Sequence, residues 1–307
     1  MSTCFMSQLS RAVRKKASPV LVGLDPRAEM LPDALRPEIG ADPATKAEAY
    51  RRFCEEVIDV VAPLVACVKP QAAFFEELGP AGMTVLGGLI RYAQSKGLLV
   101  ILDGKRNDIG STATAYAQGI LGRQSPWGAD ALTVSPYLGD DSLAPFVDVA
   151  RSHGCGVFVL VKTSNPGGAV FQDLVANSRP VYRHVADLVE RMAAQTAGEC
   201  GYGVIEAVVG ATYPEQLAEL RQAMPHTWFL VPGFGSQGGT ARDVAAAFDS
   251  KGLGAIVNNS RGIIFAYREK AYAQRFGQQR WQEAVEAATR DMIAQLAAHT
   301  PAGLLSK

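Results

Sequence analysis

The chain has 307 residues, of which 48% are hydrophobic and 20% charged, so it can bury the core of one barrel or of two smaller domains. Its 30 basic and 30 acidic side chains cancel, which argues against nucleic acid or an anionic membrane as a partner. No apolar run approaches the roughly 18 residues of a membrane span, and residues 1–16 lack the apolar stretch of a signal peptide. Five cysteines without C-x-x-C spacing predict reduced thiols and a cytoplasmic protein.

Eight short apolar runs alternate with amphipathic helical stretches along the chain. Their nearly continuous apolarity is typical of parallel strands that are covered on both faces. In chain order the predicted strands are 19–26, 64–71, 98–105, 131–137, 157–164, 203–212, 228–235 and 254–261. The helical period predicts helices over 43–64, 83–96, 141–153, 180–195, 214–224 and 240–250.

Eight β/α units predict an α/β fold, a (β/α)₈ TIM barrel that forms a single domain over residues 1–307. Residues 1–16 and the segment beyond about residue 270 would be extra helices at the two ends. A doubly wound sheet is the alternative, but the G-x-G-x-x-G fingerprint expected after its first strand is missing.

Charged residues gather where the first three predicted strands end, which is where barrels of this kind carry their active sites. Asp25 follows the first strand, Lys69 ends the second, and Asp103 and Lys105 end the third. Because Asp103 and Lys105 are two apart, their side chains leave the same face of the strand. Buried charges are costly unless they are paired. The pattern therefore predicts either a salt-bridged strand end or a reaction centre. Asp108, beyond the strand, would fold over the barrel mouth or reach a neighbouring subunit.

The segments after the last two strands are suited to binding phosphate, as they often are in this fold. Strand 228–235 continues into "PGFGSQGGT", in which Gly235 and Gly238 flank Gln237, and glycine lets main-chain N–H groups turn toward an anion. A helix starting near Thr240 would add its positive end. Arg261, after strand 254–261, offers a planar fork to phosphate oxygens. The alternative is a glycine-rich turn and a surface arginine.

Each candidate also has an ordinary structural explanation. Asp25 stands in "DPR", a natural turn, and Lys69 could be a solubilising residue at a strand end. Asp108 could cap a helix over 108–118. Ser164 in "TSNPGG" could serve only the turn.

Four segments taken together resemble the orotidine 5′-monophosphate decarboxylase family, in its longer-chain bacterial branch. They are "CVKPQAAFFE", "LDGKRNDIGST", "KTSNPGG" and "VPGFGSQGG". The resemblance implies a cofactor-free and metal-free enzyme that converts orotidine 5′-monophosphate to UMP and CO₂ in de novo pyrimidine synthesis. It also implies a homodimer with shared active sites.

The resemblance assigns roles to individual residues. The catalytic residues that it implies are Lys69, Asp103, Lys105 and Asp108. The substrate-binding residues that it implies are Asp25 and Thr112 at the ribose, Ser164 at the pyrimidine, and Gln237, Arg261, Gly235 and Gly238 at the phosphate. Asp108 and Thr112 would come from the partner subunit. Shorter family members have Gly-Arg after the last strand, whereas the order here is Ser260-Arg261-Gly262.

Three rival functions remain open. A sugar-phosphate decarboxylase or aldolase on the same barrel shares D-x-K-x-x-D but carries a metal-binding glutamate where Lys69 stands. A Schiff-base aldolase would need a neutral amine, whereas acids flank Lys105 and favour its charged form. A catalytically silent protein would bind the nucleotide phosphate without turnover.

Overall fold

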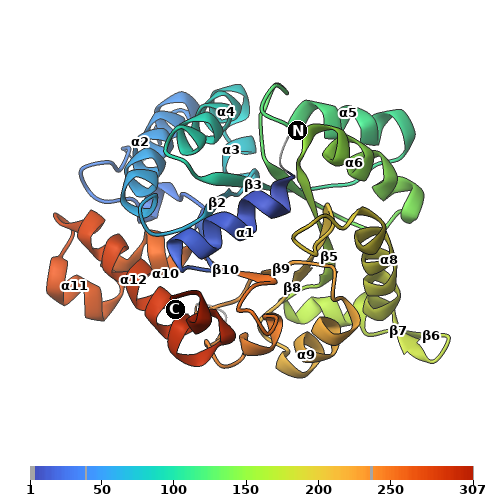
Figure 1. The fold of residues 1–307 in the computed structure, drawn as a ribbon. Coiled ribbons are helices and arrows are strands. Elements are labelled where there is room, and N and C mark those ends of the chain that lie inside the picture. Colours follow the sequence, from blue (N-terminus) through green and yellow to red (C-terminus); the bar gives the residue numbers. More distant parts are fainter. Residues whose placement is uncertain (1–3, 39, 236–237, 307) are drawn as a thin grey trace.

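The structure, a computed structural model, describes residues 4–38, 40–235 and 238–306. Eight parallel strands close into a barrel in the order β1-β10-β9-β8-β5-β4-β3-β2 (Figure 1). They are β1 (Val20–Leu24), β2 (Cys67–Pro70), β3 (Leu99–Arg106), β4 (Ala131–Val134), β5 (Gly156–Lys162), β8 (Ile205–Val209), β9 (Phe229–Val231) and β10 (Ala255–Asn259). Each overlaps a predicted strand, so the prediction of a (β/α)₈ barrel is confirmed.

Helices surround the barrel, and further helices are added at both ends of the chain. The surrounding ones are α2 (Pro43–Val61), α3 (Ala73–Glu76), α4 (Gly79–Ser95), α5 (Gly110–Ile120), α6 (Asp140–His153), α7 (Ala169–Gln172), α8 (Val181–Thr196), α9 (Pro214–Ala223) and α10 (Arg261–Ile264). The added ones are α1 (Phe5–Lys16), α11 (Lys270–Phe276) and α12 (Trp281–His299). No helix in the described ranges is long and apolar enough to cross a membrane.

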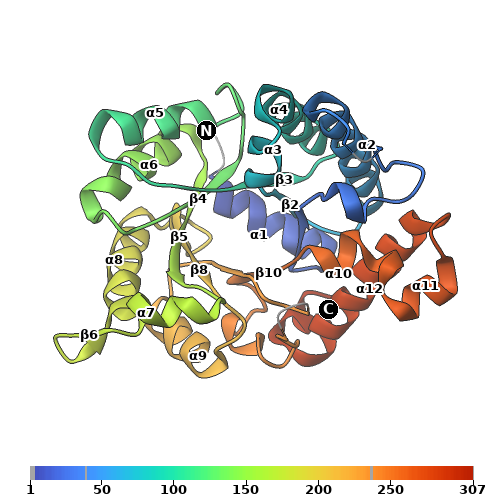
Figure 2. The same ribbon diagram turned by 180° about the vertical axis from the view of Figure 1, so that it is seen from behind.

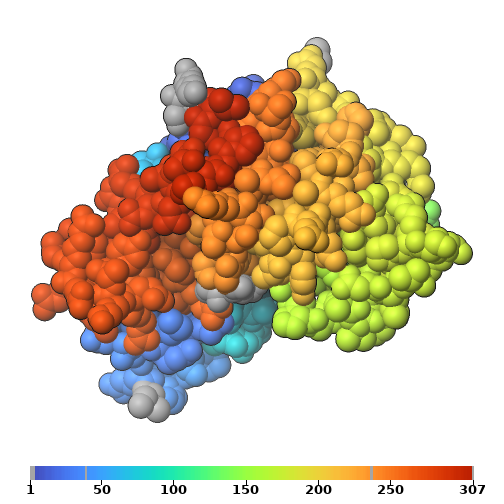
Figure 3. All heavy atoms as spheres, turned by 90° about the horizontal axis from the view of Figure 1, so that it is seen from below, coloured from blue at the N-terminus to red at the C-terminus, as the bar shows by residue number. Residues whose placement is uncertain are grey.

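The added C-terminal helices pack against the N-terminal part of the barrel wall. The ring of Trp281 in α12 lies 5.2 Å from the ring of Phe53 in α2, and Phe53 stacks on Phe265 at 5.5 Å. In the space-filling view, these red and orange segments lie beside the blue N-terminal ones, and the yellow-green residues around 165–185 lie on the other side (Figure 3). Aromatic contacts therefore hold α12 and the segment after β10 against α2.

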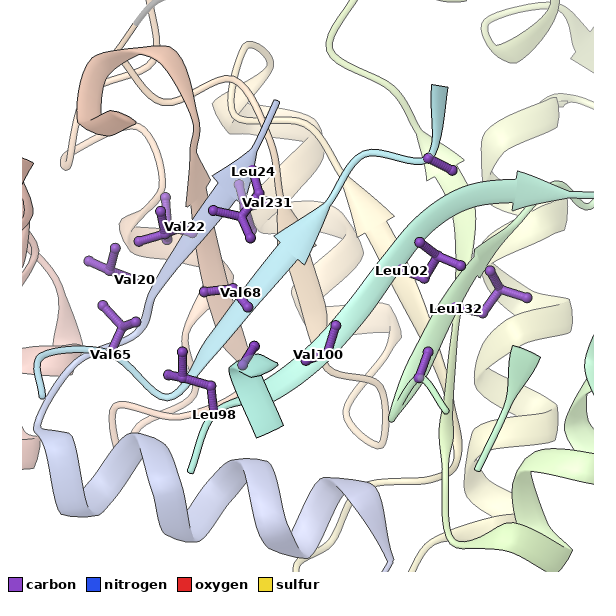
Figure 4. Close-up of a cluster of buried hydrophobic side chains, with 14 of the residues drawn as sticks. Val20, Val22, Leu24, Val65, Val68, Leu98, Val100, Leu102, Leu132 and Val231 are labelled. Carbon is purple, nitrogen blue, oxygen red and sulfur yellow. The ribbon is translucent and has the colours of Figure 1, made fainter. Parts of the chain in front are cut away.

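Strand alternation divides the core into an outer and an inner part. Val20, Val22 and Leu24 of β1 belong to the cluster between the strands and the surrounding helices (Figure 4). The Leu21 side chain, between Val20 and Val22, points inward and belongs to a second cluster that includes four residues of α1. Helix α1 crosses the barrel end that faces the viewer in Figure 1 and lies behind the strands in the opposite view (Figure 2). Helix α1 therefore closes the amino-terminal end of the barrel.

Two features differ from the sequence prediction. The prediction of an α-helix over 240–250 is wrong. The segment forms one 3₁₀ turn, Ala245–Ala247, and is otherwise irregular. The Thr240 N–H and hydroxyl both donate to the Asp243 carboxylate, and the Asp249 carboxylate accepts two later N–H groups, so local side-chain bonds compete with a helix. No α-helix N-terminus therefore follows the glycine-rich loop.

The second difference is a hairpin that the sequence analysis did not predict. It pairs β6 (Val175–Ala176) with β7 (Arg179–Pro180) and projects from the body of the molecule (Figure 1). The two turn residues, Asn177 and Ser178, have φ angles of 49° and 62°. A turn with two positive φ angles matches the twist of the flanking strands.

Candidate active site

The barrel interior ends at its carboxyl-terminal rim in a layer of charged side chains. In β3, Leu99 and Ile101 belong to the inner cluster. Asp103 continues on the same face and therefore stands above them at the mouth, where the Lys105 ammonium reaches its carboxylate. In the neighbouring β2, Lys69 reaches the same level. The two charged residues that the sequence singled out on this strand are thus in contact.

Asp103 bridges two lysines at the centre of this layer. Lys69 Nζ lies 2.8 Å from its Oδ2 atom, and Lys105 Nζ lies 2.7 Å from its Oδ1 atom. Gln71 Nε2 donates to Oδ2 at 3.0 Å, and the Thr133 hydroxyl donates to Oδ1 at 2.9 Å. The carboxylate thus accepts four hydrogen bonds, which fills its lone-pair positions. Sequence reasoning missed Gln71 and Thr133, although Gln71 follows Lys69 by two on the same strand face.

The electrostatics keep the buried members of this layer charged. Burial raises the pKa of Asp103, but the two ammonium groups and their hydrogen bonds outweigh it and hold the pKa well below its usual range. Burial lowers the pKa of Lys69, but the carboxylates of Asp103 and Asp25 outweigh it and raise the pKa. Lys69 and Asp103 are 4% and 8% exposed, whereas the Lys105 side chain is 48% exposed. Lys105 is therefore the ammonium that a ligand can approach.

The main chain bends sharply at Lys105. This residue has a φ of 42°, a left-handed conformation that costs a residue with a side chain about 1–2 kcal/mol. The pairing register between β3 and β4 shifts between Leu102 and Arg106, and the Lys105 N–H donates to the Thr133 hydroxyl at 3.0 Å. The irregularity thus lies within the last residues of β3, where Lys105 meets Asp103. Strain of this kind concentrates at functional sites.

A cavity of about 450 Å³ opens above the charged layer. Its lining includes Asp25, Phe74, Glu76, Asp103 and Lys105. The Oδ1 atom of Asp25 is buried and accepts no hydrogen bond from the described residues, so it remains available to a ligand hydroxyl. Glu76 is ion-paired with Arg106.

A second cavity, of about 480 Å³, carries positive charge. Its lining includes Arg27, Gly235, Arg261, Arg268 and Glu269. Gly235 has a φ of 71°, which a residue with a side chain rarely adopts. This cavity collects two of the predicted phosphate residues, Gly235 and Arg261, and its charge suits an anion.

Four other predicted residues, Asp108, Thr112, Ser164 and Gly238, line neither cavity. The Asp108 carboxylate accepts the N–H of Ile109 at 2.8 Å, and Thr112 is exposed on α5. The Ser164 main chain accepts a hydrogen bond from the Thr212 hydroxyl at 3.2 Å. Gly238 lines a separate hollow of about 220 Å³. Gln237 lies outside the described residues. One chain thus brings together Asp25, Lys69, Asp103 and Lys105, but not Asp108 and Thr112.

The chain is similar to known proteins along most of its length. The family model described as "Orotidine 5'-phosphate decarboxylase / HUMPS family" matches residues 18–276. The chain is 56% identical over 297 residues to the orotidine 5'-phosphate decarboxylase of Rhodopirellula baltica, covering 95% of this chain and 98% of the relative. It is 42% identical over 267 residues to the protein of that name from Deinococcus radiodurans, covering 87% and 91%.

Solved structures agree with the sequence relatives. A putative orotidine 5'-phosphate decarboxylase from Streptomyces avermitilis superposes with a TM-score of 0.79 at 36% identity, covering 97% of each chain. The UMP synthase of Leishmania donovani superposes with a TM-score of 0.77 at 34% identity, covering 97% of this chain and 57% of that one. The chain therefore belongs to the orotidine 5'-phosphate decarboxylase / HUMPS family, as its motifs predicted.

Proposed function

We propose that this chain decarboxylates orotidine 5′-monophosphate to UMP and CO₂ in pyrimidine synthesis. The observation that carries the proposal is the Asp103 carboxylate held between Lys69 and Lys105 on the wall of a cavity. The names of the relatives support this substrate.

The chemistry needs a positive charge at one carbon atom. Breaking the bond between C6 and the carboxylate leaves an electron pair in the plane of the pyrimidine, where no adjacent carbonyl can delocalise it. The Lys105 ammonium would stand beside C6 and stabilise that pair. Two opposite charges about 4 Å apart interact by roughly 4 kcal/mol at an effective dielectric constant near 20. If the interaction exists only in the transition state, it accelerates the reaction by nearly three powers of ten.

Lys105 would then complete the reaction as an acid. It transfers a proton to C6, and water returns a proton to its amine. Asp103 would lie beside the substrate carboxylate, so the repulsion between them is relieved as CO₂ leaves. Lys69 would hold Asp103 in place. Because side chains of this chain meet the charge at C6, the proposal needs no metal or other cofactor.

The two cavities suit the two ends of the nucleotide. Asp25, whose Oδ1 atom accepts no hydrogen bond within the described part of the chain, would accept one from a ribose hydroxyl. Ser164 would contact the pyrimidine. The phosphate would occupy the positive cavity and bind Arg261, Gly235, Gly238 and Gln237.

We also propose a homodimer in which Asp108 and Thr112 complete the partner subunit's site. Among the described residues, Asp108 and Thr112 are not part of the lining of either cavity described above. Large exposed apolar side chains lie close to them in the sequence and on the neighbouring loop. These are Ile109 (55% exposed), Tyr116 (39%), Tyr137 (80%) and Leu138 (45%). The loops after β3 and β4 start side by side, because the Ser135 N–H donates to the Arg106 carbonyl at 2.9 Å. Exposed apolar side chains gathered in one region are typical of a protein interface.

Two coarser features of the protein belong to the same proposal. Residues 1–307 would act as one catalytic domain, because the barrel draws strands from β1 to β10 and the added helices pack on it. The five cysteines are unpaired, and three of them are buried, which supports a reducing compartment such as the cytoplasm. The partner would be a small nucleotide rather than a nucleic acid or a membrane.

The test uses the purified protein, a chelator and orotidine 5′-monophosphate. UMP and CO₂ should appear without an added cofactor, and Lys105→Ala should nearly abolish them. Lys251→Ala, which removes an exposed lysine outside the site, is the matched control and should retain activity. Binding of UMP without turnover, or an active Lys105→Ala variant, would contradict the proposal.

A further inference from the structure

We propose that Arg27 is a further substrate-binding residue, which recognises the 5′-phosphate of the nucleotide. The proposal rests on the function proposed above and extends its binding site. Arg27 follows Asp25 by two residues and precedes the 3₁₀ turn Ala28–Met30. Neither the motifs nor the resemblance assigned it a role.

Arg27 lines the positive cavity and carries a donor that no described residue uses. It lines that cavity with Gly235 and Arg261. Its Nε atom is buried and donates no hydrogen bond to any residue in the described ranges, and no carboxylate there forms an ion pair with it. A buried donor without an acceptor is rare in folded proteins unless a ligand or water completes it. A phosphate oxygen would supply the missing acceptor.

Arg27 also joins the two cavities. Its guanidinium group lies over the ring of Phe74, with its central carbon 5.4 Å from the ring centroid. Phe74 lines the first cavity together with Asp25 and Lys105. Stacking on an aromatic face leaves the edge of the guanidinium plane free for two phosphate oxygens. A nucleotide with its base above Lys105 would thus place its phosphate within reach of Arg27.

The other charges of the positive cavity define which ligand it takes. Arg268 already donates to the main-chain carbonyl of Glu29 at 3.2 Å. Among the described residues of this lining, Glu269 is the one acidic side chain, and the basic ones are the three arginines Arg27, Arg261 and Arg268. The excess of positive charge favours a doubly charged phosphate monoester over a neutral group. Arg27 would therefore discriminate the nucleotide from the nucleoside.

The experiment compares two substrates that differ only in the phosphate. Arg27→Met keeps an unbranched apolar stem against Phe74 but removes the charge, and Arg27→Lys keeps the charge but removes the fork. We expect Arg27→Met to lower kcat/KM for orotidine 5′-monophosphate roughly 10- to 150-fold, the range of a hydrogen bond to a charged group. Arg27→Lys should lower it less. With the nucleoside orotidine, kcat/KM should change less than about twofold in both variants.

Calorimetry with UMP and uridine gives a readout that does not depend on turnover. Arg27→Met should weaken UMP binding and leave uridine binding unchanged. The control is Arg290→Met, which removes the same charge from an exposed position on α12. An equal loss for substrates with and without phosphate, or a loss below threefold for the nucleotide, would overturn the proposal. If Arg27→Met fails to fold, Arg27→Gln is used with the same criteria. A wild-type protein that binds UMP but converts no substrate would refute the proposed function, and the binding comparison would still decide the role of Arg27.

Discussion

Replacing Asp103 by asparagine keeps the shape of the side chain and removes the charge between two lysines. Removing one partner of a buried ion pair costs about 3–5 kcal/mol, because the other charge is left buried. Lys69 is that charge here, since it is 4% exposed, whereas the half-exposed Lys105 can turn to water. Asp25 still faces Lys69. We therefore expect Asp103→Asn to lower the free energy of unfolding by about 3 kcal/mol, the lower end of that range.

Urea unfolding at pH 7 of the wild type, Asp103→Asn, Lys69→Met and the double variant measures this effect. Adding Lys69→Met to Asp103→Asn removes the orphaned ammonium and should recover about 1 kcal/mol or more. The depressed pKa of Asp103 means that its stabilising contribution is present above its ordinary pKa of about 4 and is lost as the pH falls below it. The difference between wild type and Asp103→Asn should therefore shrink on acidification from pH 5. A loss below about 1 kcal/mol at pH 7, or a double variant less stable than Asp103→Asn, would refute the reasoning.

Two further predictions test the dimer and a buried acid. Equal amounts of Lys105→Ala and Asp108→Ala chains are mixed so that they exchange subunits. About a quarter of wild-type activity should return, because half of the dimers are mixed and each mixed dimer has one intact site of its two. Activity no higher than that of the separate variants would remove the support for shared sites. Glu206 is fully buried, and its carboxyl group accepts a hydrogen bond from the main-chain N–H of Trp228. Burial raises the pKa of Glu206 well above the usual range. The free energy of unfolding of the wild type should therefore decline as the pH rises from about 4.5 through that pKa. Glu206→Gln should abolish this decline, so the stability of the variant relative to the wild type should increase between pH 5 and pH 8. If the difference in stability between the two proteins does not vary with pH, Glu206 is not a buried, protonated acid.

The charged residues at the barrel mouth could be predicted from two sequence patterns. Continuous apolar runs located the strands, and alternation placed Asp103 and Lys105 on one face. Gln71 and Thr133 could not be singled out, because their contacts depend on how β2, β3 and β4 are registered against one another. Polar residues at strand ends are common, and only the register shows which of them meet one carboxylate.

The region after β9 shows where a local pattern misleads. Residues 240–250 have the period of a helix, yet the carboxylates of Asp243 and Asp249 bond to nearby N–H groups and fold the segment into turns. Arg27 was missed for a different reason. In the sequence it belongs to a turn, and its surroundings arise only when the loops after β1, β9 and β10 come together around one cavity.

The lysine–aspartate layer is held together by contacts within the chain itself. Burying Lys69 and Asp103 is costly, and the barrel fixes both on strands beneath that layer, so folding rather than substrate binding positions these charges. Binding energy from the phosphate is therefore not needed to bring Lys105 to Asp103. It can act instead on the parts that the single chain leaves apart, the Ser164 segment and the residues supplied by the partner subunit. On this argument the loss of Arg27 should slow the nucleotide reaction without disturbing the stability that the charged layer contributes.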